Sequence, residues 1–197
     1  MEVCNAGKMQ PAHTTRPVGN RQIHLIDGAF DEGFVAMCNT WLDRIPYHRA
    51  DYDAEGVRDY LHFKIEIPQT ELAANPVTRM LETIVRREVA DIYGHLFPEL
   101  QRVHVNLAPY GDHFTAHIDS AQGVTAIYFA NREWRDEWQG ETLFYAEGEP
   151  VAAVAPRPGR LALLPADMVH RVGAPSRLFA GARLTVAFKF TTREKPE

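Results

Sequence analysis

Apolar residues recur at two different spacings along this chain, and the change between them divides it into two parts. Between residues 31 and 94 the apolar positions are mostly three or four residues apart, as on a helix with one buried face. From residue 101 onward they form short runs separated by Gly, Pro and other turn residues, which is typical of strands. Helices followed by strands indicate an α+β fold.

The first 20 residues fit neither spacing. They are mostly polar, contain Pro and Gly, and show no apolar period, so we expect residues 1–20 to be a flexible leader. The remaining length suits one hydrophobic core with little room for a second. Residues 21–197 are therefore expected to form a single domain.

The helical part contains one strong candidate helix. Its spacing predicts a helix over residues 75–94, where Asn75 can cap the first turn, Pro76 suits the first helical position and Gly94 can end the helix. The expected buried face consists of Met80, Leu81, Ile84, Val85, Val89 and Ile92. Weaker patterns predict a strand and turn over 21–30, a helix over 31–45, a loop over 46–59 and a strand over 60–67.

The second part contains eight short β-type runs. They cover residues 103–109, 114–119, 124–131, 140–147, 150–156, 160–166, 168–174 and 183–190. Many short strands separated by turns predict an antiparallel sandwich or barrel.

Composition and charge narrow the functional classes. The net charge of −5 argues against a nucleic-acid-binding protein, which usually carries a basic excess. No apolar run is long enough to cross a bilayer, and residues 1–20 lack the apolar section of a secretory signal, so we expect no membrane partner and a cytoplasmic location. Cys4 and Cys38 are too far apart to form a metal-binding or redox motif, and a reducing compartment is expected.

The residues that suggest chemistry begin with the only His-x-Asp in the chain, His117-Ile118-Asp119. Residues two apart in a strand point to the same face, so the imidazole and the carboxylate would converge. His170, on a later predicted strand, can complete a set of two histidines and one carboxylate, which binds iron(II) and leaves open positions. By itself the motif is weak, because a chance pair or a hydrogen-bonded surface couple would have the same spacing.

A zinc-protease interpretation is rejected. His113 and His117 are four residues apart, but the segment HFTAH lacks the Glu that this motif needs, and its flanks have a β-type pattern.

A second set of polar residues lies on the last predicted strand. Arg183 and Thr185 share one face of it, with Leu184, Val186 and Phe188 on the other. An Arg that points inward can bind a carboxylate through two N–H groups, and Thr185 can add a hydroxyl. The alternative is that Arg183, Thr185 and Lys189 face water.

These features occur together with three landmarks in a fixed order. Tyr110-Gly111-Asp112 precedes the His-x-Asp, Gly140-Glu141-Thr142 opens a middle strand, and Pro158-Gly159-Arg160 leads into the strand before His170. From about Arg102 to Phe190 the chain resembles the iron(II)/2-oxoglutarate-dependent oxygenase superfamily, in its prolyl-4-hydroxylase-like branch.

The resemblance implies a double-stranded β-helix (jelly-roll) core with supporting N-terminal helices. It implies Fe(II), 2-oxoglutarate and O2 as cofactor and cosubstrates, with release of succinate and CO2. The residues it would assign are His117, Asp119 and His170 as catalytic metal ligands, Arg183 and Thr185 at the 2-oxoglutarate tail, and Tyr110 and Tyr128 in the cosubstrate pocket. Phe129 stands where several relatives have a second tyrosine, so carboxylate binding would depend more on Arg183, Thr185, and Tyr128 or Asn106. Asp119 favours hydroxylation, because related halogenases have a small residue there.

The substrate is the least constrained part. We expect a small molecule, such as an amino acid or a biosynthetic intermediate, because no peptide-docking module is visible. Tyr47 and Arg49, in a segment over 46–60 that is either a lid or a solvated connector, and Trp134 and Trp138, which either line the entrance or pack at a sheet edge, are candidate substrate residues. The alternatives are a protein (prolyl-type) hydroxylase and a non-catalytic metal-binding jelly roll. The sequence predicts no oligomeric state.

Overall fold

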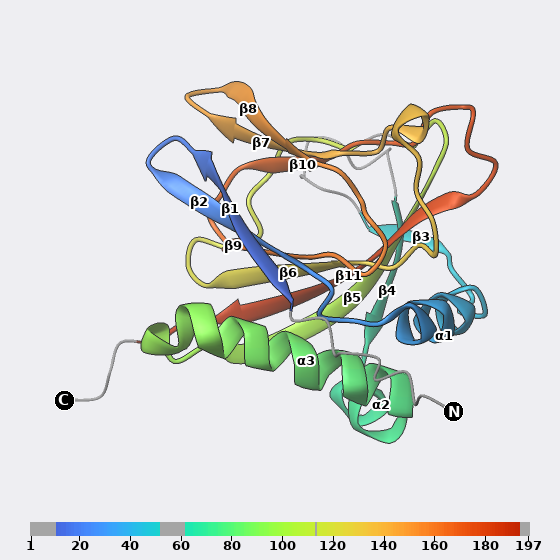
Figure 1. Ribbon diagram of the computed structural model, residues 1–197, viewed down its shortest axis with the longest axis horizontal. Coiled ribbons are helices and arrows are strands. Elements are labelled where there is room, and N and C mark those ends of the chain that lie inside the picture. Colours follow the sequence, from blue (N-terminus) through green and yellow to red (C-terminus); the bar gives the residue numbers. More distant parts are fainter. Residues whose placement is uncertain (1–10, 52–61, 113, 194–197) are drawn as a thin grey trace, which may run out of the picture.

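The computed structural model describes residues 11–51, 62–112 and 114–193, and consists of two antiparallel sheets with a helical layer (Figure 1). The larger sheet has the strand order β1-β2-β9-β6-β11-β5-β4-β3, and the smaller has the order β10-β7-β8. The strands are β1 (Ala12–Val18), β2 (Arg21–Asp27), β3 (Arg49–Asp51), β4 (His62–Ile67), β5 (Glu99–Pro109), β6 (Val124–Phe129), β7 (Thr142–Ala146), β8 (Glu149–Val154), β9 (Leu161–Pro165), β10 (His170–Val172) and β11 (Ala182–Thr191). Strands that cross over between two facing sheets make a jelly roll, as expected.

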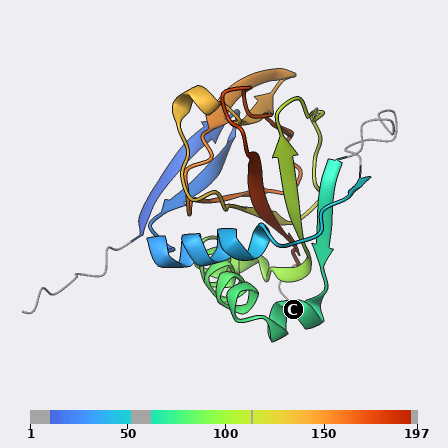
Figure 2. The same ribbon diagram turned by 90° about the vertical axis from the view of Figure 1, so that its right-hand side faces the viewer.

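The helices cover the face of the larger sheet that points away from the smaller one (Figure 2). They are α1 (Glu32–Leu42), α2 (Gln69–Ala74) and α3 (Pro76–Tyr93), and two short 3-10 turns are η2 (Gly94–Leu96) and η3 (Asp136–Trp138). Asp31 caps α1 by accepting a hydrogen bond from the backbone N–H of Phe34 (2.7 Å), and Asn75 caps α3 by accepting from that of Val77 (2.9 Å). The predicted helices over 31–45 and 75–94 are thus confirmed.

The main core lies between these helices and the larger sheet. Helix α3 contributes Leu81, Val85 and Val89, which are all at most 1% exposed. Met80 is 44% exposed, so its assignment to the buried face was wrong. One residue is a turn of about 100° on a helix, which carries Met80 away from the stripe centred on Leu81.

Strand β11 separates this core from a cavity between the two sheets. Leu184, Val186 and Phe188 belong to the core, whereas Arg183, Thr185, Ala187 and Lys189 line the cavity. The strand lies inside the sheet with β5 on one side and β6 on the other. The alternation along 183–190 therefore has the predicted faces, and its polar face is directed into the molecule rather than to water.

Three expectations need correction. Residues 12–18 form β1 and pair with β2, so the flexible leader does not extend to residue 20. Six of the seven β1 residues are exposed, and a strand held at a sheet edge by backbone hydrogen bonds leaves no apolar period. Residues 114–119 form no regular strand, only an isolated bridge between His117 and His170. The predicted loop contains the short strand β3.

No helix among the described residues is long and apolar enough to span a membrane.

Candidate metal centre and its pocket

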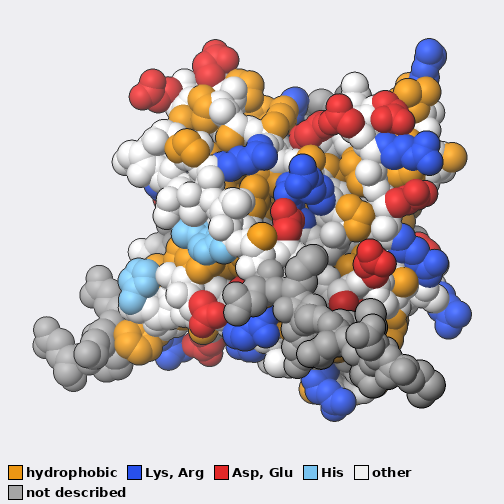
Figure 3. Space-filling model, in the orientation of Figure 1, with side chains coloured by type: hydrophobic (Ala, Val, Ile, Leu, Met, Phe, Trp, Pro, Cys, Tyr) orange, Lys and Arg blue, Asp and Glu red, His pale blue; other side chains and the backbone are white. Residues whose placement is uncertain are grey.

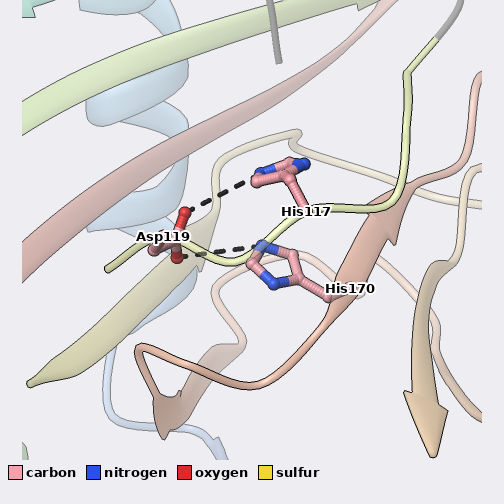
Figure 4. Close-up of side chains that lie close together, drawn as sticks. All are labelled: His117, Asp119 and His170. Atoms are coloured by element: carbon pink, nitrogen blue, oxygen red, sulfur yellow. Dashed lines mark ion pairs between the residues drawn. The ribbon is translucent and has the colours of Figure 1, made fainter. Parts of the chain in front are cut away.

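A cavity of about 320 Å³ lies between the two sheets, and three potential metal ligands meet in it (Figure 4). His117 and Asp119 come from the segment between β5 and β6, and His170 begins β10. Reciprocal backbone hydrogen bonds of 3.0 and 2.9 Å join His117 to His170 and fix their spacing. One donor atom from each of the three side chains lies within 4.8 Å of the others. The pocket therefore brings the predicted triad together.

Both imidazoles are oriented with the same nitrogen toward the centre of this group. The Nδ1 of His117 lies 3.0 Å from the carbonyl oxygen of Thr115, and that of His170 lies 2.9 Å from the carbonyl oxygen of Met168. A carbonyl only accepts, so each Nδ1 carries the hydrogen and each Nε2 presents a lone pair. The two Nε2 atoms lie 3.8 Å from the Oδ1 and Oδ2 atoms of Asp119 respectively. Two imidazole nitrogens and a carboxylate with open space around them fit iron(II).

Two of these groups, His170 and Asp119, have the protonation states that metal binding requires. Burial lowers the pKa of His170 to about 4, against the opposing charge of Asp119, so the ring is neutral at neutral pH. Burial by itself would raise the pKa of Asp119, but the Lys189 ammonium and His170 hold it well below its usual range. Thr125 also donates a hydrogen bond of 2.6 Å to Oδ2 of Asp119, and Lys189 contacts the same oxygen. Asp119 is thus ionised, and Thr125 and Lys189 fix the position of its carboxylate.

Arg183 is located at one end of the pocket and is 1% exposed. Its Nε donates to the carbonyl oxygen of Gly140 and its Nη2 donates to Oγ1 of Thr142, both at 2.8 Å. The guanidinium also lies over the Phe129 ring, 5.3 Å from its centre. Burial lowers the pKa of Arg183 to about 10, which leaves it charged at neutral pH. A guanidinium has five N–H donors, so Arg183 retains three for a ligand carboxylate.

The Gly140-Glu141-Thr142 landmark has a direct structural reason. Gly140 has φ +83°, and a Cβ there would lie 3.4 Å from Cδ of Arg183 and 3.0 Å from the Trp134 ring. Its carbonyl and the Thr142 hydroxyl are the two groups that orient Arg183. Thr142 is a pocket residue whose role the sequence did not predict.

Asn106 and Thr185 lie side by side on the pocket wall. They are paired in the register of β5 and β11, and both line the cavity, as expected for cosubstrate contacts. Their neighbour on the same face across β11 is Phe129, the residue that stands in place of a tyrosine.

Two predicted cosubstrate residues do not line the pocket. Tyr128 pairs with Val186 and packs against Phe30 and Phe34 in the helical core, with no exposed surface, so its assignment was wrong. Tyr110 lies beyond the end of β5 and is 61% exposed. It is not among the residues that line the cavity, so the structure does not bring it into the pocket as predicted.

The candidate substrate residues are also outside the pocket lining. Tyr47 packs against the main core, and Trp134 and Trp138 pack with Phe179 as an aromatic cluster, with ring centres 4.4 to 5.7 Å apart. Packing, rather than lining the entrance, is the role this geometry gives the two tryptophans. Arg49 lies over the Phe63 ring and forms an ion pair of 3.4 Å with Asp112. Most of the proposed lid, residues 52–60, falls outside the described residues.

Several pocket residues carry no role in the sequence-based interpretation. They are His62, Lys64, Arg102, His104 and Lys189. Strand alternation gives the face of two of them, because His104 shares a face with Asn106 and Lys189 shares one with Arg183. Cations on a strand are usually solvent-exposed, however, so the residue type did not indicate a pocket wall. His62 lies buried at the pocket wall with its ring stacked on Phe114, at 4.2 Å between ring centres.

Comparison with known proteins agrees with this geometry. Residues 103–190 match the model of the 2OG-Fe(II) oxygenase superfamily. A prolyl-4-hydroxylase from Pseudomonas putida superimposes with a TM-score of 0.66 at 20% identity, covering 87% of this chain and 94% of that one. A prolyl hydroxylase from Trichoplax adhaerens, solved with a hypoxia-inducible-factor peptide, gives 0.66 at 16% identity, with 86% and 83% covered. The 2-oxoglutarate-dependent epimerase SnoN from nogalamycin biosynthesis gives 0.63 at 18% identity, with 86% and 77% covered. No curated protein sequence matches the chain.

The resemblance to prolyl-4-hydroxylase-like oxygenases is therefore confirmed, as is the jelly-roll fold. Fe(II), 2-oxoglutarate and O2 are the cofactor and cosubstrates of this superfamily, and the His117–Asp119–His170 group fits the iron.

Proposed function

We propose that this chain, a 2OG-Fe(II) oxygenase by the likeness of residues 103–190, hydroxylates a C–H bond of a small-molecule substrate. The observation that carries the proposal is the convergence of the metal triad and the Arg183 guanidinium in one cavity. The cavity of about 320 Å³ is at the small end of the range for ligand pockets, which suits a cosubstrate and a compact second molecule.

Each group would have a separate task. His117, Asp119 and His170 would hold the iron, which with 2-oxoglutarate and O2 supplies the oxidising power. Arg183 would bind the far carboxylate of 2-oxoglutarate through its remaining N–H groups, with Thr185 and Asn106 beside it. The position of Asp119 in the ligand set favours hydroxylation over halogenation, because a carboxylate occupies the place that a halide would need.

The second candidate is a protein hydroxylase of the prolyl type. The likeness to structures described as prolyl hydroxylases favours it, one of them with a bound peptide fragment. Against it, a proline side chain has no charge, whereas this pocket is lined by several cationic residues. We therefore place the small-molecule substrate first.

In the first test, iron(II) and 2-oxoglutarate are added anaerobically, and the weak visible charge-transfer band of their complex is measured by absorption spectroscopy. We expect the band in the native protein and its loss in His117→Ala, Asp119→Ala and His170→Ala. Arg183→Ala should retain iron binding and weaken 2-oxoglutarate binding by about a hundredfold, since a charge-assisted two-point contact is lost. A folded protein that gives no band would overturn the proposal, and a protein that binds both without ever releasing succinate would be the non-catalytic jelly roll.

Substrate class is tested separately. Succinate release is measured across amino acids and biosynthetic intermediates, and in parallel a lysate is screened for a protein that gains 16 mass units in dependence on iron and 2-oxoglutarate. Turnover by a small molecule supports the proposal. A mass gain on a protein, without turnover by any small molecule, would favour the second candidate.

A further inference from the structure

Three cationic side chains surround His104 on the cavity face of the larger sheet. Lys64 lies on β4, Arg102 lies on β5 with His104, and Lys189 lies on β11. Lys189 is six residues from Arg183 along β11, or about 20 Å between backbone positions. These cations are therefore at the other end of the pocket from the proposed 2-oxoglutarate tail.

Arg102 and Lys189 are direct partners in the register of β5 and β11. Like charges opposite one another on neighbouring strands repel, and such a pair is destabilising unless an anion lies between. Lys189 has Asp119 as a partner. Among the described residues, no carboxylate forms an ion pair with Arg102.

His104 gives an independent indication of a ligand. Its side chain lines the cavity and is 6% exposed, and its Nδ1 has no hydrogen-bond partner among the described residues. A buried polar atom without a partner costs free energy that a bound ligand can offset. Burial first, and then Lys189, Lys64 and Arg102, keep the pKa of His104 well below its ordinary value, so its ring is neutral and can donate or accept.

The charge of the pocket differs from that of the chain. The chain has a net charge of −5, and acidic and basic side chains are interspersed on the face shown in Figure 3. Among the described residues, four cations and one carboxylate line the pocket, an excess of three positive charges. Iron(II) and doubly negative 2-oxoglutarate cancel each other, so loading the pocket leaves this excess unchanged.

We propose that Arg102 and Lys189, with His104 beside them on the same face of the sheet, form a subsite for a carboxylate or phosphate group of the substrate. The inference rests on the proposed oxygenase function and adds the class of substrate, a small anion. The subsite would anchor the substrate by its charged group while another part lies at the metal, because Lys189 contacts the ligand Asp119 directly.

The test uses protein loaded with manganese(II) in place of iron and saturated with 2-oxoglutarate, so that no turnover occurs. Inorganic phosphate and propionate are the probes, and their nuclear relaxation by the nearby manganese is measured in separate titrations. We expect relaxation to be enhanced for one or both probes. Phosphate alone would identify a phosphorylated substrate, and propionate a carboxylic acid.

Variants locate the probe. Arg102→Gln should raise the apparent Kd of the responding probe about tenfold, the loss expected for one charge-assisted contact. The double variant Arg102→Gln/Lys189→Met should abolish the response at saturating manganese. The matched control is Arg79→Gln, which removes an exposed cation from α3 on the opposite side of the sheet and should change nothing.

Three outcomes would overturn the subsite. The first is no relaxation of either probe. The second is an equal response in Arg102→Gln, which would mean direct binding to the metal. The third is a response that appears only when 2-oxoglutarate is left out, which would mean that the probe occupies the cosubstrate site. A failure of the proposed function is distinguishable, since the protein would then bind no 2-oxoglutarate, or would bind it without ever releasing succinate.

Discussion

The Lys189 ammonium contacts Oδ2 of Asp119, so the only carboxylate of the metal-binding triad also carries a buried ion pair. The two residues come from different segments, with Lys189 on β11 and Asp119 in the connection before β6. A fixed positive charge beside a ligand carboxylate opposes the arrival of a metal cation, because the two cations repel at short range and low dielectric.

Replacement of this cation is expected to strengthen metal binding. Lys189→Met should bind Fe(II) about tenfold more tightly, because it removes the repulsion between the lysine ammonium and the metal cation. That repulsion is a few kcal/mol at close range, and solvent screens only part of it. The measurement is an anaerobic Fe(II) titration in competition with a coloured chelator. Lys189→Arg, which keeps the charge, is the control and should bind as the native protein does. Weaker binding by Lys189→Met would show that the lysine holds Asp119 in place rather than competing with the metal.

Gly140 is expected to control the cosubstrate end of the pocket. A Cβ in Gly140→Ala would press on Arg183 and Trp134, so we expect 2-oxoglutarate affinity to fall about tenfold with Fe(II) affinity unchanged. Gly148→Ala is the matched control, because Gly148 has the same φ of +83° but nothing within 4 Å of the added carbon. Calorimetry with each variant checks this. Equal losses in the two variants would mean that backbone strain, and not contact with Arg183, is responsible.

The Asp27–Arg160 pair joins β2 to the turn before β9. Asp27 accepts two hydrogen bonds from Arg160, of 2.8 and 2.6 Å, and the arginine side chain is 4% exposed. Asp27→Asn should lower the free energy of unfolding by about 1–2 kcal/mol, since it leaves a buried guanidinium without its counter-charge while Asp27 itself is partly exposed. Asp167→Asn, which breaks the exposed pair with Arg21, should cost under about 0.5 kcal/mol.

The Asp27–Arg160 pair should also make the free energy of unfolding depend on pH. The hydrogen bond from Arg160 lowers the pKa of Asp27 below its ordinary value of 3.8, so its contribution is fully present above that value. It is lost as the pH falls through the lower pKa of the folded state. The free energies of unfolding of the native protein and Asp27→Asn, measured by denaturant titration, should thus differ at neutral pH and converge as the pH falls well below 3.8. A difference that grows on acidification would contradict this assignment.

Cys38 is expected to be inert in the folded protein. It has no exposed surface, and burial raises the pKa of its thiol to about 12, against a small opposing effect of Tyr128. At pH 8 the thiolate is then about one part in ten thousand. In a Cys4→Ser background, iodoacetamide should modify Cys38 only after denaturation, as read by mass spectrometry. Rapid modification under native conditions would show that the core between α1 and β6 opens readily.

The sequence correctly predicted those parts of the site where the spacing of neighbouring residues determines the direction of their side chains. Two-residue alternation placed Arg183 and Thr185 on one face of β11, and the close spacing of His117 and Asp119 limited how far apart they can lie. The caps of α3 were likewise readable, because Asn75 and Pro76 act on their own helix.

What the sequence analysis missed concerns positions where residue type does not show which face of the sheet a side chain occupies. Every residue of β6 is buried, so apolar character cannot tell which face Tyr128 occupies, and only the pairing with Val186 places it in the helical core. The cationic wall is a second case. Arg102 and Lys189 come together through strand pairing across more than 80 residues, which single-strand patterns do not contain.

Strand β11 allows ligand preference and fold stability to change independently. Its even-numbered residues from Leu184 to Phe188 hold the helices, and its odd-numbered residues from Arg183 to Lys189 face the cavity. A substitution at position 185, 187 or 189 alters what the cavity accepts without opening the core behind it. Variation confined to these alternate positions, together with those facing them on β5, is therefore the economical route by which this scaffold acquires a new substrate.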